Sequence, residues 1–204
     1  DQEFRTKQPA AFAANPSLYD IGGVSNGTVT PLLNEGTIRP LDDLIEKYGQ
    51  NLRPNQLIRI DGETMAVAMM VNVQHLMYRE DIFEDLGLEV PTTYDEVLAA
   101  AEAIQEAGVV DYPLGMTMAS GWNIGQDFVN MYVGYGGEFS PQAFESIGSS
   151  EAGMQALDMM QRLSEYADPE VLVSDSTYVQ QQFQQGKIAM ANLWASRGGA
   201  MDNE

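Results

Sequence analysis

Two tryptophans are the residues in this sequence best suited to recognising a small molecule. Trp122 lies in a predicted loop between a strand and a helix, and Trp194 follows a predicted strand. An indole offers a flat apolar face, while the amide of Asn123 and the guanidinium of Arg197 can hydrogen-bond to hydroxyls. This combination suits a sugar ring, which has an apolar C–H face and a hydroxyl rim. The local sequence is equally compatible with two core aromatics.

Residue types that support covalent catalysis or metal binding are sparse. The chain has no cysteine and one histidine, His75, which excludes a thiolate nucleophile, a disulfide and any metal site built on two imidazoles. His75 lies in an apolar run, and no Gly-x-Ser-x-Gly motif accompanies it, so a structural role is favoured over a general base. We therefore expect no catalytic residue, no metal and no cofactor.

A glycine-rich segment, Gly22-Gly23-Val24-Ser25-Asn26-Gly27, follows a predicted strand and precedes a predicted helix. Backbone amides at such a place can bind an anion. The segment lacks the Lys-Ser/Thr of a P-loop and the spacing of a dinucleotide fingerprint, so a tight connection is favoured over a nucleotide site. A loop at the carboxyl end of a strand is still a place for ligand contacts.

Composition narrows the classes of partner. The 204 residues include 10 Lys and Arg against 30 Asp and Glu, which gives a net charge of −20. This charge repels phosphate backbones and anionic lipid surfaces, so nucleic acid is not an expected partner. No apolar run approaches the roughly 20 residues of a membrane span. Because 44% of the residues are hydrophobic, the chain can bury a core of one or two domains.

Strand and helix patterns alternate along the chain, which predicts an α/β fold. Asp61-Gly62 predicts a hairpin turn, and the apolar run 65–77 a buried strand that then changes direction. Thr93 and Glu96 form a capping-box pattern for a helix over 94–107, ended by Gly108. Further strands are predicted over 18–21, 112–118 and 187–191, and further helices over 30–35, 41–48, 78–86, 124–132, 150–167 and 177–185.

Seven segments in a fixed order resemble a known family. They are Tyr19-Asp20-Ile21, 33–44, Asp61-Gly62 with its apolar strand, 76–88, Val90 to Glu96, Gly134-Tyr135-Gly136-Gly137, and Phe183 to Met190 followed by Trp194. Together they resemble the family 1 extracellular solute-binding proteins of ABC importers, the maltose-binding protein group. The resemblance covers about residues 11–201.

The resemblance implies a type II periplasmic-binding-protein-like fold, with two α/β lobes joined at a hinge. Residues 1–70 would belong to the first lobe and 71–204 to the second, with the hinge strand near 69–73. The family begins with a βα unit and continues past the Trp194 region back into the first lobe, and neither part has a counterpart here. We therefore expect an interior fragment that is incomplete at both ends.

The resemblance also implies the function and the site. A carbohydrate would bind in a cleft between the lobes and pass to the membrane permease of an ABC importer, without covalent chemistry. The protein would be a monomer, periplasmic or extracellular, and membrane-associated through the transporter. The matching positions are Ser25 and Asn26 after the first strand, Asn72 on the crossing strand, Trp122 and Asn123 in a loop, Trp194 as the stacking platform, and Arg197 for hydroxyls or the carboxylate of an acidic sugar.

The sequence is also compatible with two other classes of function. The first is a glycoside hydrolase that acts on similar sugars through a pair of carboxylates, although no spacing among the 30 Asp and Glu residues singles out a pair. The second is an interaction module whose helices dock a partner protein.

Overall fold

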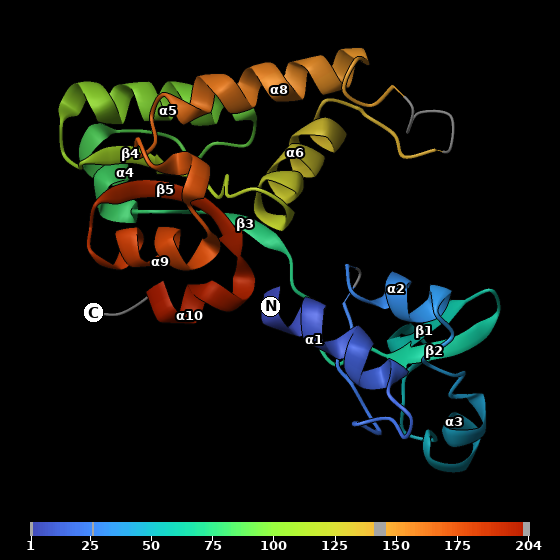
Figure 1. The fold of residues 1–204 in the computed structure, drawn as a ribbon. Coiled ribbons are helices and arrows are strands. Elements are labelled where there is room, and N and C mark those ends of the chain that lie inside the picture. The colour runs from blue at the N-terminus through green and yellow to red at the C-terminus, as the bar shows by residue number, and fades with distance from the viewer. Residues whose placement is uncertain (1, 26, 141–145, 202–204) are drawn as a thin grey trace. The chain divides into compact units, whose positions relative to one another are not determined.

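The structure is a computed structural model that describes residues 2–25, 27–140 and 146–201. The chain forms two compact units, Asp1–Val71 (unit 1) and Asn72–Glu204 (unit 2), which Figure 1 shows as a ribbon. Both units combine helices with strands, so the predicted α/β class is confirmed. Among the described helices, none has the length and apolar composition needed to cross a bilayer.

Unit 1 is built around a two-stranded hairpin. Strands β1 and β2 pair antiparallel, and Asp61 and Gly62 between them both have positive φ angles, 52° and 89°. Two positive φ angles give the turn whose twist matches that of hairpin strands, so the predicted Asp-Gly hairpin is confirmed. The elements of unit 1 are α1 (Gln2–Ala13), α2 (Val29–Asn34), α3 (Asp42–Tyr48), η1 (Pro54–Gln56), β1 (Leu57–Ile60) and β2 (Glu63–Val67).

One carboxylate joins α3 to the hairpin. Thr64 of β2 is fully buried and donates its backbone N–H and its hydroxyl to the two oxygens of Asp42, over 2.9 and 3.0 Å. These hydrogen bonds favour the ionised carboxyl and lower the pKa of Asp42 below its usual range. The start of α3 is thereby fixed to the sheet.

Two predictions for the first 77 residues are wrong. Residues 18–21 form no strand, and the side chains of Leu18 and Ile21 are exposed because no described strand lies beside them to pair with them. The run 65–77 is not one buried strand, since β2 ends at Val67 and an exposed connection follows, in which Met69 is 95% exposed. Helix α1, which has Pro9 in its interior, was not predicted.

Unit 2 contains a three-stranded sheet in the order β3-β5-β4, formed by β3 (Gln74–Tyr78), β5 (Ile188–Trp194) and β4 (Tyr112–Gly115). Strand β3 is antiparallel to β5, and β4 is parallel to β5. The central strand β5 is the most buried, because Ile188, Met190 and Leu193 are fully buried. Its position between two partners explains why it reads as an apolar run.

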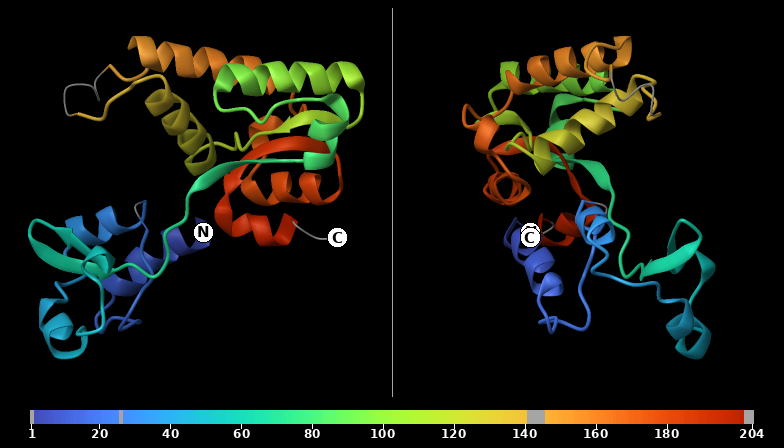
Figure 2. Two further views of the ribbon diagram at one scale, coloured as in Figure 1. Left: turned by 180° about the vertical axis from the view of Figure 1, so that it is seen from behind. Right: turned by 45° about the vertical axis from the view of Figure 1, so that its right-hand side comes forward.

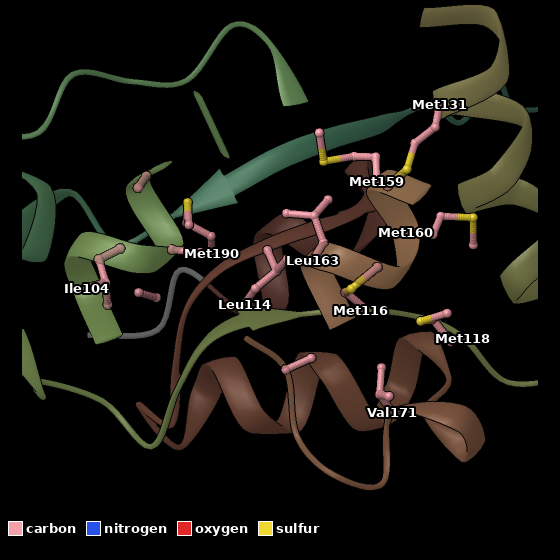
Figure 3. Close-up of a cluster of buried hydrophobic side chains, with 14 of the residues drawn as sticks. Ile104, Leu114, Met116, Met118, Met131, Met159, Met160, Leu163, Val171 and Met190 are labelled. Atoms are coloured by element: carbon pink, nitrogen blue, oxygen red, sulfur yellow. The ribbon is translucent and has the colours of Figure 1, made fainter. Parts of the chain in front are cut away.

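Helices cover both faces of this sheet. Figures 1 and 2 show α5 and α8 side by side above one face and α9 with α10 below the other. The first face is rich in methionine, whose flexible side chain fills irregular spaces (Figure 3). The elements outside the sheet are α4 (Glu80–Leu86), α5 (Tyr94–Ala107), α6 (Trp122–Gly134), α8 (Glu151–Ser164), η2 (Val171–Val173), α9 (Ser176–Gln184), η3 (Ala195–Arg197) and α10 (Gly198–Met201).

Helix α5 follows its sequence signals closely. The Thr93 hydroxyl accepts from the N–H of Glu96, and the Glu96 carboxylate accepts from the N–H of Thr93, so both halves of the capping box form. Gly108 ends the helix in the left-handed region at φ 65°, where glycine carries no steric penalty. The predicted bounds 94–107 are confirmed.

Candidate functional site

The strand directions of unit 2 bring most of the candidate residues to one edge of its sheet. Strands β4 and β5 are parallel and therefore end at the same edge, and β3, antiparallel to β5, begins there. We call this the site edge. Trp194 is the last residue of β5, Trp122 and Asn123 follow β4 at the start of α6, and Asn72 closely precedes β3. In α/β sheets the carboxyl ends of parallel strands are the usual place for ligands.

Trp194 lies on the face of the sheet that α6 also contacts. It pairs across the strands with Gln74, and directly paired residues place their side chains on the same face. The Gln74 side chain accepts a hydrogen bond from Asn130 of α6, which identifies that face. The indole of Trp194 is partly buried, so it combines support from neighbouring residues with access to solvent.

Trp122 is the first residue of α6, and Gly121 precedes it with a φ of 96°. This angle lies in the region that side chains disfavour, so glycine allows the sharp turn that starts the helix here. Trp122 is 39% exposed and Asn123 is partly buried. The two indoles thus follow neighbouring parallel strands, and Trp194 faces the side of the sheet on which α6 lies.

The side chain of Asn72, the first residue of unit 2, is hydrogen-bonded to Ser196, which lies 124 residues later in the sequence. Its Nδ2 donates to Ser196 Oγ over 3.0 Å, and its Oδ1 accepts from the Ser196 N–H over 3.2 Å. The Val73 carbonyl next to it accepts from the Ala195 N–H over 2.8 Å. A carboxamide has a second N–H and a second lone pair, so Asn72 retains capacity to bind a hydroxyl.

Arg197 is held by helix α9. Its guanidinium donates to Gln180 Oε1 over 2.8 Å, to Ser176 Oγ over 3.0 Å and to Thr177 Oγ1 over 3.2 Å. All three acceptors are neutral, so the positive charge of Arg197 is not cancelled by these contacts. The arginine therefore joins η3 to the start of α9 as well as standing near the site edge.

The remaining candidates belong to unit 1. Ser25 is exposed and begins the turn into α2, since its carbonyl accepts from the N–H groups of Thr28 and Val29 over 3.0 Å each. Its own N–H donates to the hydroxyl of Thr28 over 2.8 Å. Asn26 lies outside the described residues.

Sequence reasoning did not identify three polar residues of the site edge: Gln74, Asn130 and Ser196. Gln74 is two residues after Asn72, a polar alternation at the start of a strand that could have indicated it. Asn130 is placed by a pairing that spans 56 residues, for which the sequence offers no local signal. His75, the alternative general base, is exposed on β3 opposite Leu193. Within the described ranges, no group of three or more His, Asp or Glu side chains could hold a metal ion.

Several solved structures share this fold. A solute-binding protein from Agrobacterium vitis S4 with bound D-mannitol has a TM-score of 0.77 at 22% identity, covering 98% of this chain and 50% of that one. One from Agrobacterium radiobacter K84 in complex with ribitol has a TM-score of 0.74 at 22% identity, covering 84% and 45%. Maltose-bound T. maritima MalE3 has a TM-score of 0.72 at 19% identity, covering 82% and 44%.

These likenesses define the class by its fold, and the sequence defines the family. The model of the bacterial extracellular solute-binding proteins matches residues 1–204. The chain therefore belongs to the bacterial extracellular solute-binding protein family. It spans about half the length of the solved structures that it resembles. Among proteins with curated descriptions, none matches it.

Proposed function

We propose that the protein binds a carbohydrate or sugar alcohol at the site edge and delivers it to the membrane permease of an ABC importer. The observation that carries this proposal is the partly buried indole of Trp194, on the sheet face contacted by α6, whose first residue is Trp122. A sugar ring would stack its C–H face on these indoles. The ribitol, D-mannitol and maltose bound to the similar structures support this ligand class.

Hydrogen bonds would orient the ligand beside the indoles. Asn72 and Asn123 offer carboxamides. The described hydrogen-bond acceptors of Arg197 are neutral, and its guanidinium suits a hydroxyl or the carboxylate of an acidic sugar. Units 1 and 2 would act as the two lobes, with residues 69–73 as the hinge between them. Ser25 and Asn26 would contact the ligand from the first lobe, so that binding stabilises a closed state.

The protein would release its ligand unchanged, because the mechanism needs only stacking, hydrogen bonding and closure. We propose that it works as a monomer in the periplasm or at the cell surface, associated with the membrane through its transporter. Family membership supports this location and role.

Titration calorimetry with a panel of maltose, D-mannitol, ribitol and D-glucuronate tests the ligand class. We expect saturable heat with at least one neutral member, and additional affinity for D-glucuronate if Arg197 contacts it. Absence of heat with every sugar, together with binding of a peptide, would contradict the proposal. Turnover of a chromogenic glycoside would show a hydrolase instead.

A further inference from the structure

Unit 2 contains a cavity that is not lined by any of the six candidate ligand contacts that the structure describes. Its volume is about 500 Å³, within the range of small-molecule sites. Its floor is the sheet face formed by Leu76, Leu114 and Asn192, and α5, α6 and α8 supply its other walls. Leu76 and Asn192 pair directly, two residues along the strands from the Gln74–Trp194 pair. The cavity therefore lies behind the site edge, on the same face of the sheet.

One oxygen of a buried carboxylate in this cavity lacks a hydrogen-bond partner among the described residues. Asp127 of α6 is only 4% exposed, and its Oδ2 accepts from the Thr117 hydroxyl over 3.1 Å. Its Oδ1 has no hydrogen-bond partner among the described residues. Burial of a carboxyl with so few donors disfavours its charged form and raises the pKa of Asp127 to about 7. A bound cation or donor would remove this penalty.

Two tyrosine rings line the same cavity as this carboxylate. Tyr94 and Tyr135 both line the cavity, with ring centroids 6.2 Å apart and planes inclined by 30°. Burial, and after it the negative charge of Asp127, raises the pKa of Tyr94 to about 12, which reflects the proximity of the two groups. Adjacent aromatic faces attract cations through the ring quadrupole.

The remaining lining fits an organic cation better than a sugar or an anion. Among the described residues that line the cavity, none is Lys, Arg or His, whereas Asp95 adds a second carboxylate. Most other lining side chains are apolar, including Met131 and Leu163, so the many hydroxyls of a sugar would find few partners. Arg162 is a cation close enough to act on Tyr135, but it does not line the cavity and forms an ion pair with Asp158 over 3.7 Å.

We propose that this cavity binds a small organic ammonium ion with apolar substituents. The cationic head would lie against Asp127 and the faces of Tyr94 and Tyr135, and the substituents would contact Leu114, Met116 and Met131. This site is separate from the carbohydrate site proposed above and does not depend on it.

Methionine methyl NMR can test the site with choline as the probe. We expect saturable shifts of the Met116 and Met131 methyl signals on adding choline chloride at pH 8 and constant ionic strength. The uncharged isostere 3,3-dimethyl-1-butanol should bind at least about tenfold more weakly, since it lacks the charge that Asp127 and the rings attract. Equal affinity for the two probes, or no shift at about 50 mM choline, a concentration well above the millimolar Kd of a weak ligand, would overturn the proposal.

Substitutions at Asp127 and Tyr135 test which groups bind the cation. Asp127→Asn should lower choline affinity about tenfold, to the level of the neutral isostere. The control Glu106→Gln, an exposed carboxylate in the last turn of α5, should leave it unchanged. If Asp127→Asn does not fold, Tyr135→Leu should still lower affinity about three- to tenfold. Full choline binding in the folded Asp127→Asn protein, or its loss in Trp194→Ala, would overturn the proposal.

Discussion

Asn72 and Ser196 hold each other through two hydrogen bonds, although they are 124 residues apart in the sequence. The pair joins the segment that leads into β3 to the turn that follows β5. Because Trp194 lies two residues before Ser196, the pair fixes the backbone on which the proposed stacking platform stands. The same carboxamide would then both orient the site edge and contact the ligand.

Replacing Asn72 with Ala should lower the free energy of unfolding by about 1 kcal/mol, because two exposed hydrogen bonds are lost. Chemical denaturation measures this change, and hydrogen exchange of the Ser196 amide should become faster. Ser196→Ala is the matched control, since it removes the hydroxyl but keeps the backbone donor. Its effect should be smaller, and an equal or larger effect would contradict the two-bond arrangement.

Replacing Trp194 with Ala should weaken sugar binding by about 1–3 kcal/mol, as the loss of an aromatic contact does. Calorimetry with the best ligand of the sugar panel measures the change. Tyr48→Ala is the control, because Tyr48 is an aromatic on α3 that is 68% exposed. Unchanged affinity in Trp194→Ala would remove this residue from the site.

Replacing Asp127 with Asn should change how stability depends on pH. In the folded native protein the carboxyl of Asp127 keeps its proton up to about pH 7, whereas in the unfolded chain it loses the proton near pH 4. The unfolded state is therefore favoured as the pH rises through this window, and stability falls by up to about 4 kcal/mol between about pH 4 and pH 8. The Asp127→Asn variant would carry no such penalty.

Urea denaturation at about pH 4, 6 and 8 measures the difference between the two proteins. The stability of the Asp127→Asn variant should rise relative to that of the native protein by about 4 kcal/mol over this range. Tyr94, the titratable neighbour across the cavity, has its pKa raised to about 12 and stays neutral throughout. A difference that does not vary with pH would show that the pKa of Asp127 is not raised in the folded state.

Replacing Gly115 with Ala should destabilise unit 2 by about 1–3 kcal/mol through overpacking. The added Cβ would lie 2.5 Å from Ile188 Cδ1 and 2.7 Å from Val179 Cγ1, and both neighbours are fully buried. Thermal or chemical denaturation measures the loss. Gly125→Ala in α6 is the control, because its Cβ would meet no atom within 4 Å.

Alanine is also the better helix former, so Gly125→Ala should be neutral or stabilising by up to about 1 kcal/mol. If both glycine variants lose the same amount of stability, close packing of α9 against β4 is not the cause.

Much of the fold could be predicted because its signals are local. The capping box at Thr93 and the terminal Gly108 fix α5, and Asp61-Gly62 fixes the hairpin. The prediction of a buried strand over 65–77 was wrong because apolar composition does not distinguish a buried strand from an exposed connection. Strand β5 continues to Trp194, past its predicted end at residue 191. The prediction stopped too early because Asn192, a polar residue that faces the cavity, interrupts the apolar pattern.

Some residues of the candidate site could be predicted from the local sequence, whereas others depend on contacts between distant segments. Trp122 and Trp194 could be nominated from their places after strands. The Gln74–Asn130 bond could not, since it depends on how β3 and α6 meet. Asp127 also escaped notice, because a carboxylate in an amphipathic helix normally faces solvent, and only the packing of α6 shows that it is buried.

The strand order β3-β5-β4 has a consequence for synthesis on the ribosome. The central strand is the last of the three to be made, and β3 and β4 do not pair with each other. Both flanking strands are therefore synthesised before the strand with which their backbone N–H and C=O groups pair. For β4, the chain from Gly115 to Ile188 must be made before β5 can pair with it. Strand pairing over such separations is slow, and unpaired strand edges are prone to aggregation until it is complete.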